Sequence, residues 1–381
     1  MFLNLKFIVG FGFLLRLLVA IWNGFFGPSP GARGDSAGMH ITAMDLPQDF
    51  ITDFSDGTSI YIFFLSKVYS LTIDTLFWGC LLSCFVWVGS AVFLLKTMDI
   101  MSFSRRNKSK AMLVYTLLPS SILFSPLTLR EPYQMLFVNI AIYAAVKIFL
   151  NKSFLHWFIF VPAIICMSAL HKGLFLFGYF MVFSTFIMLA RGRVKGFSIV
   201  KIVIAIPMFT LIIFLALSQF NNFNKGYNAR SGSKEQELKL TRSIEKYRNT
   251  GAESEARAQY MGEEKIKDIM GLLLHSPEIV LSYLFEPMPW RNLIAVDFVL
   301  IFENLLRAWL IWRVWAGFRK LPTEWKGPLV FIFINYLTLE ILWSIGTINW
   351  GTAMRHHLSS FGLLVVSAFI YSKGMTTRRK A

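Results

Sequence analysis

The sequence predicts an all-α protein, a polytopic bundle of transmembrane helices. Of its 381 residues, 55% are hydrophobic and only 16% are charged. One soluble core cannot bury so much apolar side-chain surface, whereas a lipid bilayer can cover it. Apolar runs recur at close to the roughly 20 residues that a helix needs to cross a bilayer. The alternation of apolar and polar residues that is typical of membrane β-barrels is absent from the sequence.

The spacing of these runs predicts about ten crossings. They are expected at residues 5–24, 75–95, 111–129, 133–150, 154–170, 173–190, 200–218, 292–312, 327–346 and 357–372. The first run carries one lysine, Lys6, and has no small-residue cleavage site after it, so we expect a retained helix rather than a signal peptide. The chain then divides into an N-terminal membrane region at 1–218, an external loop at 219–291 and a C-terminal membrane region at 292–381.

The net charge of +16 is distributed by side of the membrane. One set of connecting segments carries about 20 Lys and Arg against two acids, Asp99 and Glu324, which is the positive-inside pattern of cytoplasmic loops. Both termini are therefore expected in the cytoplasm, and no nucleic-acid partner is expected. The main basic residues on this side are Lys6, Arg105, Arg106, Lys108, Lys110, Arg191, Arg193, Lys195, Arg313, Arg319, Lys320, Lys326, Arg378, Arg379 and Lys380.

Several common kinds of site are not expected. The three cysteines, Cys80, Cys84 and Cys166, all fall inside expected spans, so neither a disulfide nor a zinc site is predicted. The sequence has no Gly-rich phosphate loop, Walker motif, His-Glu-x-x-His motif or convincing serine triad.

Two external segments are too long to be turns. Residues 25–74 begin with the stretch GPSPGARG and end with TSIYIFFLSKVYSL, which is apolar but short and contains Lys67. We expect short surface helices there, lying along the interface or re-entering the membrane. Residues 219–291 are polar, and a helix is expected to begin there at Ser276 and to stop at Pro287. Two capping boxes predict further helices in this loop, Ser233 with Gln236 and Thr250 with Glu253.

The stretch ARGDSAGMHITAMD places Asp35 just beyond the first span, at the membrane surface. A carboxylate there can act as a general base on a hydroxyl group that arrives from outside. The structural alternative is that Asp35 caps the helix that follows it, and the two roles are compatible. His40, about one and a half turns further along, is expected either at the surface or beside Asp35 as its partner.

In FSPLTLREPYQML, a proline stands on each side of Arg130 and Glu131. The prolines are expected to break the helix there, so that the pair lies at an outer turn, where irregular backbone lines a cavity. Arg130 can bind a phosphate in bidentate fashion, and Glu131 can hold the arginine or a sugar hydroxyl. The alternative is a salt bridge that only anchors a helical hairpin.

A second group of basic residues, in NWGTAMRHHLSS, stands at the outer end of the last expected span. Arg355, His356 and His357 are three donors in a row that suit a phosphate or pyrophosphate, although adjacent histidines point to different helix faces. The alternative is snorkelling toward lipid headgroups. Lys172 in LHKG and Arg291 in EPMPWRN lie at the same outer face.

Ionisable residues also occur within the expected spans. Arg16 is expected to pair with Asp297 or Glu340. Glu303 and Arg307 are four residues apart on a helix and are expected to neutralise each other.

These features resemble the GT-C-fold membrane glycosyltransferases, especially those found with bacterial surface-polysaccharide synthesis. The resemblance rests on GDSAGMH, LPSSILFSPLTLREPYQMLF, EPMPWRN and GTAMRHHL. It implies an inner-membrane enzyme whose active site faces the extracytoplasmic side, with a polyprenyl-phosphate-linked sugar donor and a glycan acceptor. It also implies that Asp35 activates the acceptor and that Arg130 and Arg355 bind phosphate. No second carboxylate stands directly beside Asp35, which leaves dependence on a divalent metal ion open, and no other cofactor is expected.

The sequence thus yields one set of expected site residues. The expected catalytic residues are Asp35 and Glu131, and the expected substrate-binding residues are Arg130, Lys172, Arg291, Arg355, His356 and His40.

Other classes of protein remain open. O-antigen and exopolysaccharide polymerases are similar, with a long outer loop between late spans and outer arginines; they transfer a whole glycan rather than one sugar. The corresponding arginines are Arg230, Arg242, Arg248 and Arg257. A transporter or flippase of lipid-linked glycans is the main alternative, although no internal repeat is evident. A structural membrane protein would leave the outer charges without a role.

Overall fold

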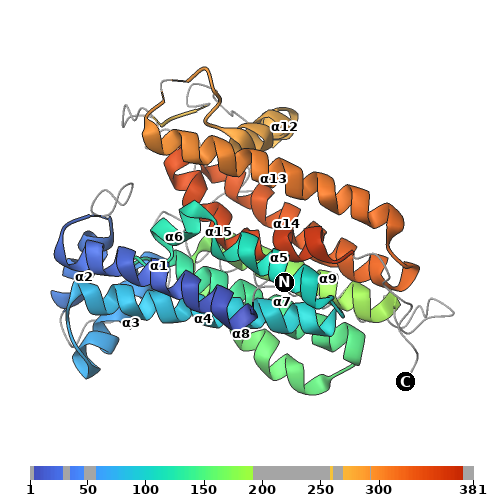
Figure 1. The fold of residues 1–381 in the computed structure, drawn as a ribbon, viewed down its shortest axis with the longest axis horizontal. Helices are drawn as coiled ribbons and strands as arrows, with labels where there is room; N and C mark the ends of the chain where they lie inside the picture. The colour runs from blue at the N-terminus through green and yellow to red at the C-terminus, as the bar shows by residue number, and fades with distance from the viewer. Residues whose placement is uncertain are drawn as a thin grey trace, which may run out of the picture.

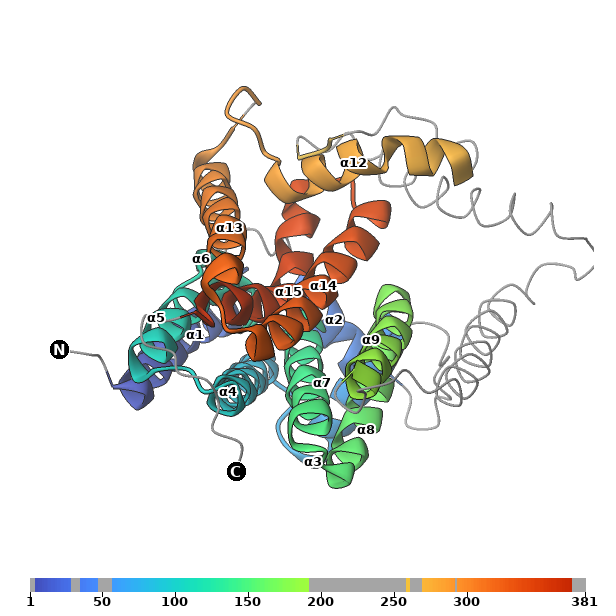
Figure 2. The ribbon, with the colours of Figure 1, turned by 90° about the vertical axis from the view of Figure 1, so that its right-hand side faces the viewer.

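The computed structural model describes residues 4–28, 35–46, 57–191, 258–260, 269–291 and 293–371. Within these ranges the chain forms helices and one isolated bridge, between Gln259 and Asn349, which confirms the all-α class. Most helices run side by side along one axis, seen from the side in Figure 1 and along the axis in Figure 2.

Five of the described helices are long and apolar enough to cross a membrane. They are α1 (Leu5–Phe25), α4 (Leu76–Ile100), α7 (Glu131–Asn151), α9 (Lys172–Arg191) and α14 (Thr323–Gly346). Their length and composition indicate an integral membrane protein in contact with a lipid bilayer. Each coincides with an expected span.

The remaining described helices are shorter or carry more charge. They are α2 (Asp35–Met44), α3 (Gly57–Leu71), α5 (Arg105–Thr116), α6 (Pro119–Phe124), the 3-10 helix η1 (Phe154–His156), α8 (Trp157–Leu170), α12 (Ile269–Phe285), α13 (Ala295–Lys320) and α15 (Trp350–Phe369). The expected span at 200–218, both capping boxes and Arg230, Arg242, Arg248 and Arg257 lie outside the described residues.

The expectation of one continuous helix at 111–129 is wrong. Helix α5 ends at Thr116 and α6 begins at Pro119, with Leu118 in an extended conformation between them. The cause is Pro119, because a proline ring disfavours helical geometry in the residue before it. Helix α6 then ends at Phe124, and the irregular segment 125–130 leads into α7.

Two other boundaries differ from expectation. Pro132 does not break a helix but lies in the first turn of α7, where its missing N–H costs nothing, so Glu131 is already helical. The expected helix start at Ser276 is wrong, because α12 begins at Ile269 and continues through Pro277. Burial of Tyr283 and Leu284 beyond the proline favours the continuous helix. Helix α12 lies across the bundle rather than along it (Figures 1 and 2).

Arg16 in α1 is fully buried and is bound by neutral acceptors. Its Nε donates to Ser125 Oγ (2.8 Å), its Nη2 to Ser121 Oγ (2.7 Å) and its Nη1 to the carbonyl oxygen of Thr116 (3.1 Å). The guanidinium also lies 3.6 Å from the ring centroid of Trp87. The cation is therefore stabilised by helix-end acceptors and an indole ring.

The expected pairing of Arg16 with Asp297 or Glu340 is wrong. The break between α5 and α6 leaves a free carbonyl group at Thr116, and this break lies beside Arg16. Asp297 instead accepts from its own helix start, at Ile294 N (2.8 Å), and from Trp350 Nε1 (3.0 Å).

Glu303 and Arg307 on α13 bind the ends of two different helices instead of each other. Glu303 Oε1 accepts from Ser120 N (2.6 Å) at the start of α6. Arg307 Nη1 donates to Leu284 O (2.7 Å) at the end of α12. Each charge lies at the helix end whose partial charge is opposite, so the two side chains form no direct salt bridge in the described structure, although Arg307 stays within electrostatic range of Glu303.

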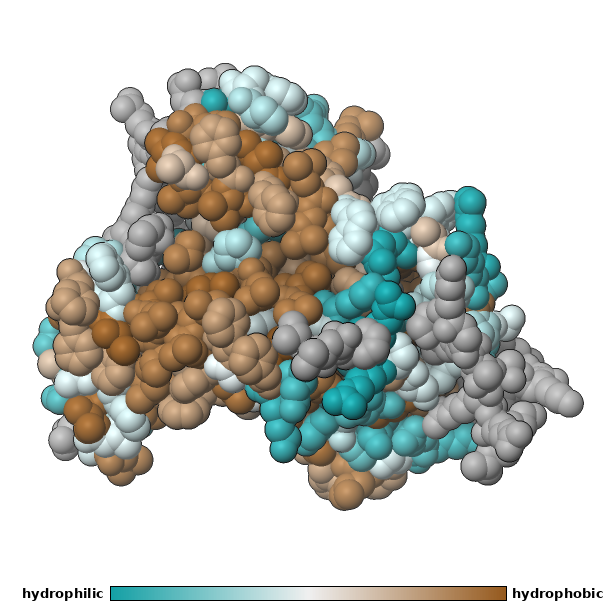
Figure 3. All heavy atoms as spheres, viewed as in Figure 1, coloured by the Kyte–Doolittle hydropathy of each residue, from teal (hydrophilic) through white to brown (hydrophobic). Residues whose placement is uncertain are grey.

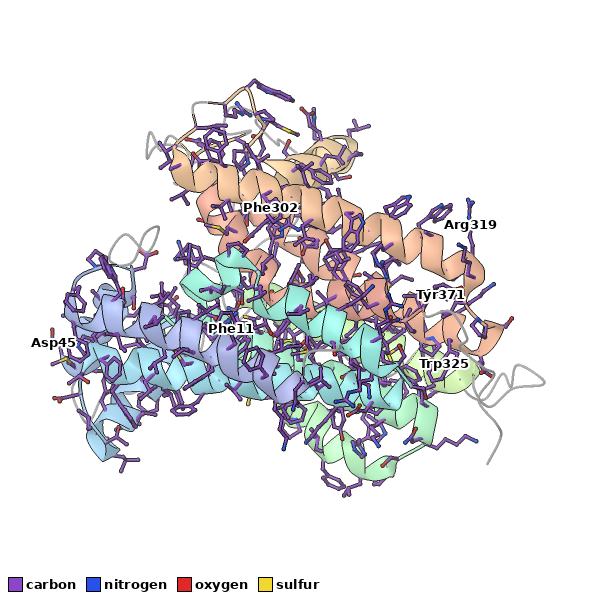
Figure 4. All side chains as sticks on the ribbon, in the orientation of Figure 1. Phe11, Asp45, Phe302, Arg319, Trp325 and Tyr371 are labelled. Carbon is purple, nitrogen blue, oxygen red and sulfur yellow. The ribbon has the colours of Figure 1, made fainter. Side chains whose placement is uncertain are left out.

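The two ends of the bundle differ in polarity. Figure 4 labels Asp45 at one end and Arg319 and Trp325 at the other. Figure 3 shows a hydrophobic surface across the middle of the visible face and hydrophilic atoms gathered toward the Arg319 end. Phe11 and Phe302, labelled along the middle in Figure 4, are 43% and 62% exposed, as suits side chains that face lipid.

Candidate functional site

Helix α2 is fixed at its first turn to the segment that precedes Arg130. Ser36 Oγ accepts hydrogen bonds from Thr128 N (3.0 Å) and from Asn23 Nδ2 of α1 (3.2 Å). Asp35 is therefore held beside this segment by its neighbour in the chain. Its negative charge in the first turn also complements the dipole of α2.

Asp35 forms an ion pair with Arg355, 320 positions away in the sequence. Arg355 Nη1 lies 2.6 Å from Asp35 Oδ2, and the side chains are 19% and 45% exposed, respectively. Among the described residues, Asp35 is the one hydrogen-bond partner of the Arg355 guanidinium. Because a guanidinium carries five N–H donors, most of the capacity of Arg355 has no protein acceptor there.

Arg130 lies where three helix ends meet. Its Nη1 donates to Thr58 Oγ1 (3.0 Å) in the first turn of α3 and to Leu170 O (3.4 Å) at the end of α8. Helix α7 begins at the next residue. No carboxylate in the described part of the chain forms a salt bridge with Arg130, so its charge is available to a ligand.

A stack of aromatic rings contains His356, the residue after Arg355 in α15. The His356 ring lies parallel to Trp343, with centroids 4.0 Å apart, and His171 packs 4.4 Å from the same indole. His356 Nδ1 lies 3.0 Å from Thr347 Oγ1. Arg130, Arg355 and His171 are all within electrostatic range of the His356 ring. We call the group of Asp35, Arg130, His171, Arg355 and His356 the mouth site.

Glu131 lies directly beside the mouth site but faces inward. Its side chain is buried, and its Oε2 atom has no hydrogen-bond partner in the described residues. It does not hold Arg130, which is bound by Thr58 and Leu170. The buried hydroxyl group of Tyr61, within electrostatic range of Glu131, also has no partner among the described residues. Unsatisfied polar atoms at such a place are costly unless a ligand, a water molecule or a proton satisfies them.

Three expected site residues lie elsewhere or have other partners. His40 faces α3, where its Nδ1 lies 3.0 Å from Tyr69 Oη, and burial lowers the pKa of its ring. Arg291 is bound by Glu286 through a 2.7 Å ion pair, and this bonding raises the pKa of Arg291. Lys172 is exposed at the start of α9. Among the described residues, neither His40 nor Arg291 forms a hydrogen bond or an ion pair with Asp35 or Arg355.

Arg355, His356 and His357 do not act as three donors in a row. Arg355 binds Asp35, and His356 stacks on Trp343. His357 points inward to Glu340 of α14, with 2.7 Å between His357 Nδ1 and Glu340 Oε2. The other ring nitrogen of His357 lies 3.2 Å from the carbonyl oxygen of Tyr283 on α12. Consecutive helical residues point about 100° apart, which explains the divergence.

Sequence reasoning did not identify Trp343, Thr347 and Thr58 as neighbours of the site. Trp343 lies within an apolar span, where a tryptophan suggests only packing, and the two threonines stand in no motif. His171 stands next to Lys172 in LHKG, but only its contact with Trp343 identifies it as part of the site. Among the described residues, no group of three or more His, Cys, Asp or Glu side chains is arranged to hold a metal ion.

Comparisons with known proteins found no match to this chain among protein-family models, curated proteins or solved structures.

Proposed function

We propose that this chain is a bacterial inner-membrane glycosyltransferase of the GT-C type, or a repeat-unit polymerase, that acts in surface-polysaccharide synthesis. It transfers a sugar or oligosaccharide from a polyprenyl-(di)phosphate donor to a glycan acceptor on the extracytoplasmic side. The observation that carries the proposal is the unfilled hydrogen-bonding capacity of Arg130 and Arg355 around one imidazole ring. Guanidinium groups with open N–H donors suit the several acceptor oxygens of a phosphate.

The reaction follows from the charges at the mouth site. The acceptor hydroxyl oxygen attacks the anomeric carbon of the donor sugar, and the bond from that carbon to the phosphate oxygen breaks. The leaving lipid phosphate keeps the bonding electron pair, and Arg130 and Arg355 stabilise its charge. The hydroxyl proton passes to the carboxylate of Asp35, which acts as the general base.

We assign Glu131 to the hydroxylated part of the substrate. The unpartnered Oε2 of Glu131 accepts a hydrogen bond from a sugar hydroxyl, which offsets the cost of its burial. This role differs from that of Asp35, since Glu131 binds a hydroxyl group and does not take its proton.

The proposed orientation in the membrane rests on charge. About ten crossings with both termini in the cytoplasm put the basic segments, including Arg319, on the inner side and the mouth site on the outer side. Asp45 and Arg319 lie at opposite ends of the bundle in Figure 4, which agrees with this orientation.

A transporter or flippase of lipid-linked glycans is the second candidate. The broken pair α5 and α6 favours it, because interrupted helices form the substrate sites of many transporters. The two functions differ in outcome: a transferase forms a new glycosidic bond, whereas a flippase moves the same molecule across the membrane unchanged.

The experiment that tests the proposal compares the wild type with Asp35→Asn in membranes supplied with a lipid-linked donor and a glycan acceptor. We expect Asp35→Asn to lower transfer by about a hundredfold or more while expression stays normal, because the base is lost. Asp45→Asn is the matched control, because it removes an exposed carboxylate close to the end of α2. Full transfer by Asp35→Asn would remove the base assignment, and donor translocation without transfer would favour the flippase.

A further inference from the structure

We propose that the Asp35–Arg355 ion pair is a latch that the phosphate of the donor opens. This inference rests on the proposed function. In the described structure one N–H of Arg355 binds one oxygen of Asp35, so the proposed base is held in an ion pair while the other N–H groups of Arg355 remain open to a phosphate. An incoming phosphate takes Arg355, and the released carboxylate becomes able to accept the proton of an acceptor hydroxyl.

The geometry makes the exchange favourable for a phosphate. The pair is held by one contact, from Nη1 to Oδ2, and the carboxylate is nearly half exposed. A phosphate offers several acceptor oxygens and engages the guanidinium through two parallel hydrogen bonds. Arg130 adds a second cation near the same ring, His356, and the described residues provide it with no carboxylate partner. A pair held by one contact is thus replaced by contacts from the phosphate to two arginines.

Asp35 stays in place after release because Arg355 is not what positions it. The start of α2 is fixed through Ser36, which binds Thr128 and Asn23. The helix dipole continues to favour a negative charge in the first turn. Only the Asp35 side chain has to turn, so the latch needs no movement of the helix.

The consequence is an order of binding. The base is free only when a phosphate-bearing donor is bound, so the acceptor hydroxyl is activated after the donor has arrived. The same arrangement suppresses the activation of water in the empty site, because Asp35 remains paired with Arg355.

The first test measures the affinity of the full-length protein in nanodiscs for inorganic pyrophosphate and, separately, for polyprenyl phosphate added to the lipid. Asp35→Asn removes the competing charge, so both probes should bind about three- to tenfold more tightly even though transfer is lost. Arg355→Met should weaken binding by about tenfold or more. Asp45→Asn should bind as the wild type does. Tighter binding of polyprenyl phosphate alone would place the latch under the control of a lipid headgroup rather than of free phosphate.

The second test uses the wild type and therefore does not depend on a variant that folds. Carbodiimide labelling of carboxylates, read by mass spectrometry, should rise at Asp35 when pyrophosphate or polyprenyl phosphate is added, while labelling of Asp45 stays constant. Unchanged or reduced labelling of Asp35, together with unchanged affinity in Asp35→Asn, overturns the latch but leaves the transferase standing. Absence of binding of either probe to the wild type overturns both proposals.

Discussion

The buried charge of Arg16 is stabilised by neutral groups. Arg16 has no carboxylate beside it in the described structure, yet its guanidinium binds two serine hydroxyls and two carbonyl groups and lies over Trp87. An isolated charge in hydrocarbon is costly, and these contacts replace much of the lost hydration. Arg16 therefore joins α1 to the broken segment that leads to Arg130.

Replacing Arg16 with methionine should destabilise the protein by about 2 kcal/mol or more, because the carbonyl group of Thr116 and the hydroxyls of Ser121 and Ser125 lose their donors. The measurement is the thermal unfolding midpoint in detergent, followed by size-exclusion fluorescence. Lys6→Met, on the same helix but exposed, should leave the midpoint nearly unchanged. An unchanged midpoint for Arg16→Met would show that the hydroxyl groups find other donors.

At the scale of elements, the short helix α6 is held by opposite charges at its two ends. Glu303 binds the backbone N–H of Ser120 at the start, and Arg16 binds Ser125 at the end and Ser121 one turn before it. Both signs match the helix dipole. A helix of six residues is not stable by itself, so these contacts from α1 and α13 fix the position of α6 and of the segment after it.

Replacing Glu303 with leucine should cost about 1–3 kcal/mol, because the buried N–H of Ser120 is left without an acceptor. Glu303→Gln keeps an acceptor oxygen, so its loss of stability should be clearly smaller. Thermal midpoints of the two variants, measured side by side, check this. Equal losses for glutamine and leucine would mean that the charge, rather than the hydrogen bond, holds α6.

Helix α3 approaches the link between α8 and α9 so closely that it requires glycine. A Cβ atom at Gly57 would lie 2.1 Å from the carbonyl oxygen of Leu170, the same atom that accepts from Arg130. Gly57→Ala should therefore move the start of α3, weaken the bond between Arg130 and Thr58, and destabilise the protein by about 1–3 kcal/mol.

The matched control is Gly38→Ala in α2, where a Cβ atom meets nothing within 4 Å. We expect that variant to be neutral or slightly stabilised, since alanine favours a helix. In Gly57→Ala, both the thermal midpoint and the affinity for pyrophosphate should fall. In Gly38→Ala, neither should fall. Equal behaviour of the two alanine variants would contradict the close approach.

At the scale of the whole molecule, lipid and water select the orientation of the bundle. Large apolar side chains are exposed along its middle, among them Phe11 and Phe302, and Arg319 lies at the opposite end from Asp45 (Figure 4). Transfer of Phe side chains from lipid to water costs about 1.5–3 kcal/mol each, so the apolar belt fixes the depth of the protein. The distribution of lysine and arginine decides which end faces the cytoplasm.

A cysteine introduced at Asp45 should react with a membrane-impermeant maleimide on intact cells, and one at Arg319 only after the membrane is opened. The background is Cys166→Ala, because Cys166 is exposed, whereas Cys80 and Cys84 are buried. The reverse pattern would invert the proposed orientation and would place the mouth site in the cytoplasm.

Sequence alone determined the features that depend on composition and on local pattern. Runs of apolar residues predict helices because every backbone hydrogen bond must be made within the segment in lipid. The positions of α1, α4, α7, α9 and α14 were predictable for that reason. The direction of each side chain near Arg355 was only partly predictable, since helical spacing separates His356 from His357 without naming their partners.

Tertiary structure decided everything that depends on contacts between distant segments. It joined Asp35 to Arg355, assigned Arg16 to a broken helix instead of a carboxylate, and turned Arg291 toward Glu286. Hydrogen bonds and ion pairs act over a few ångströms, and charge at a distance cannot choose among several partners of the same kind. The mouth site therefore exists only once the helix ends have packed together.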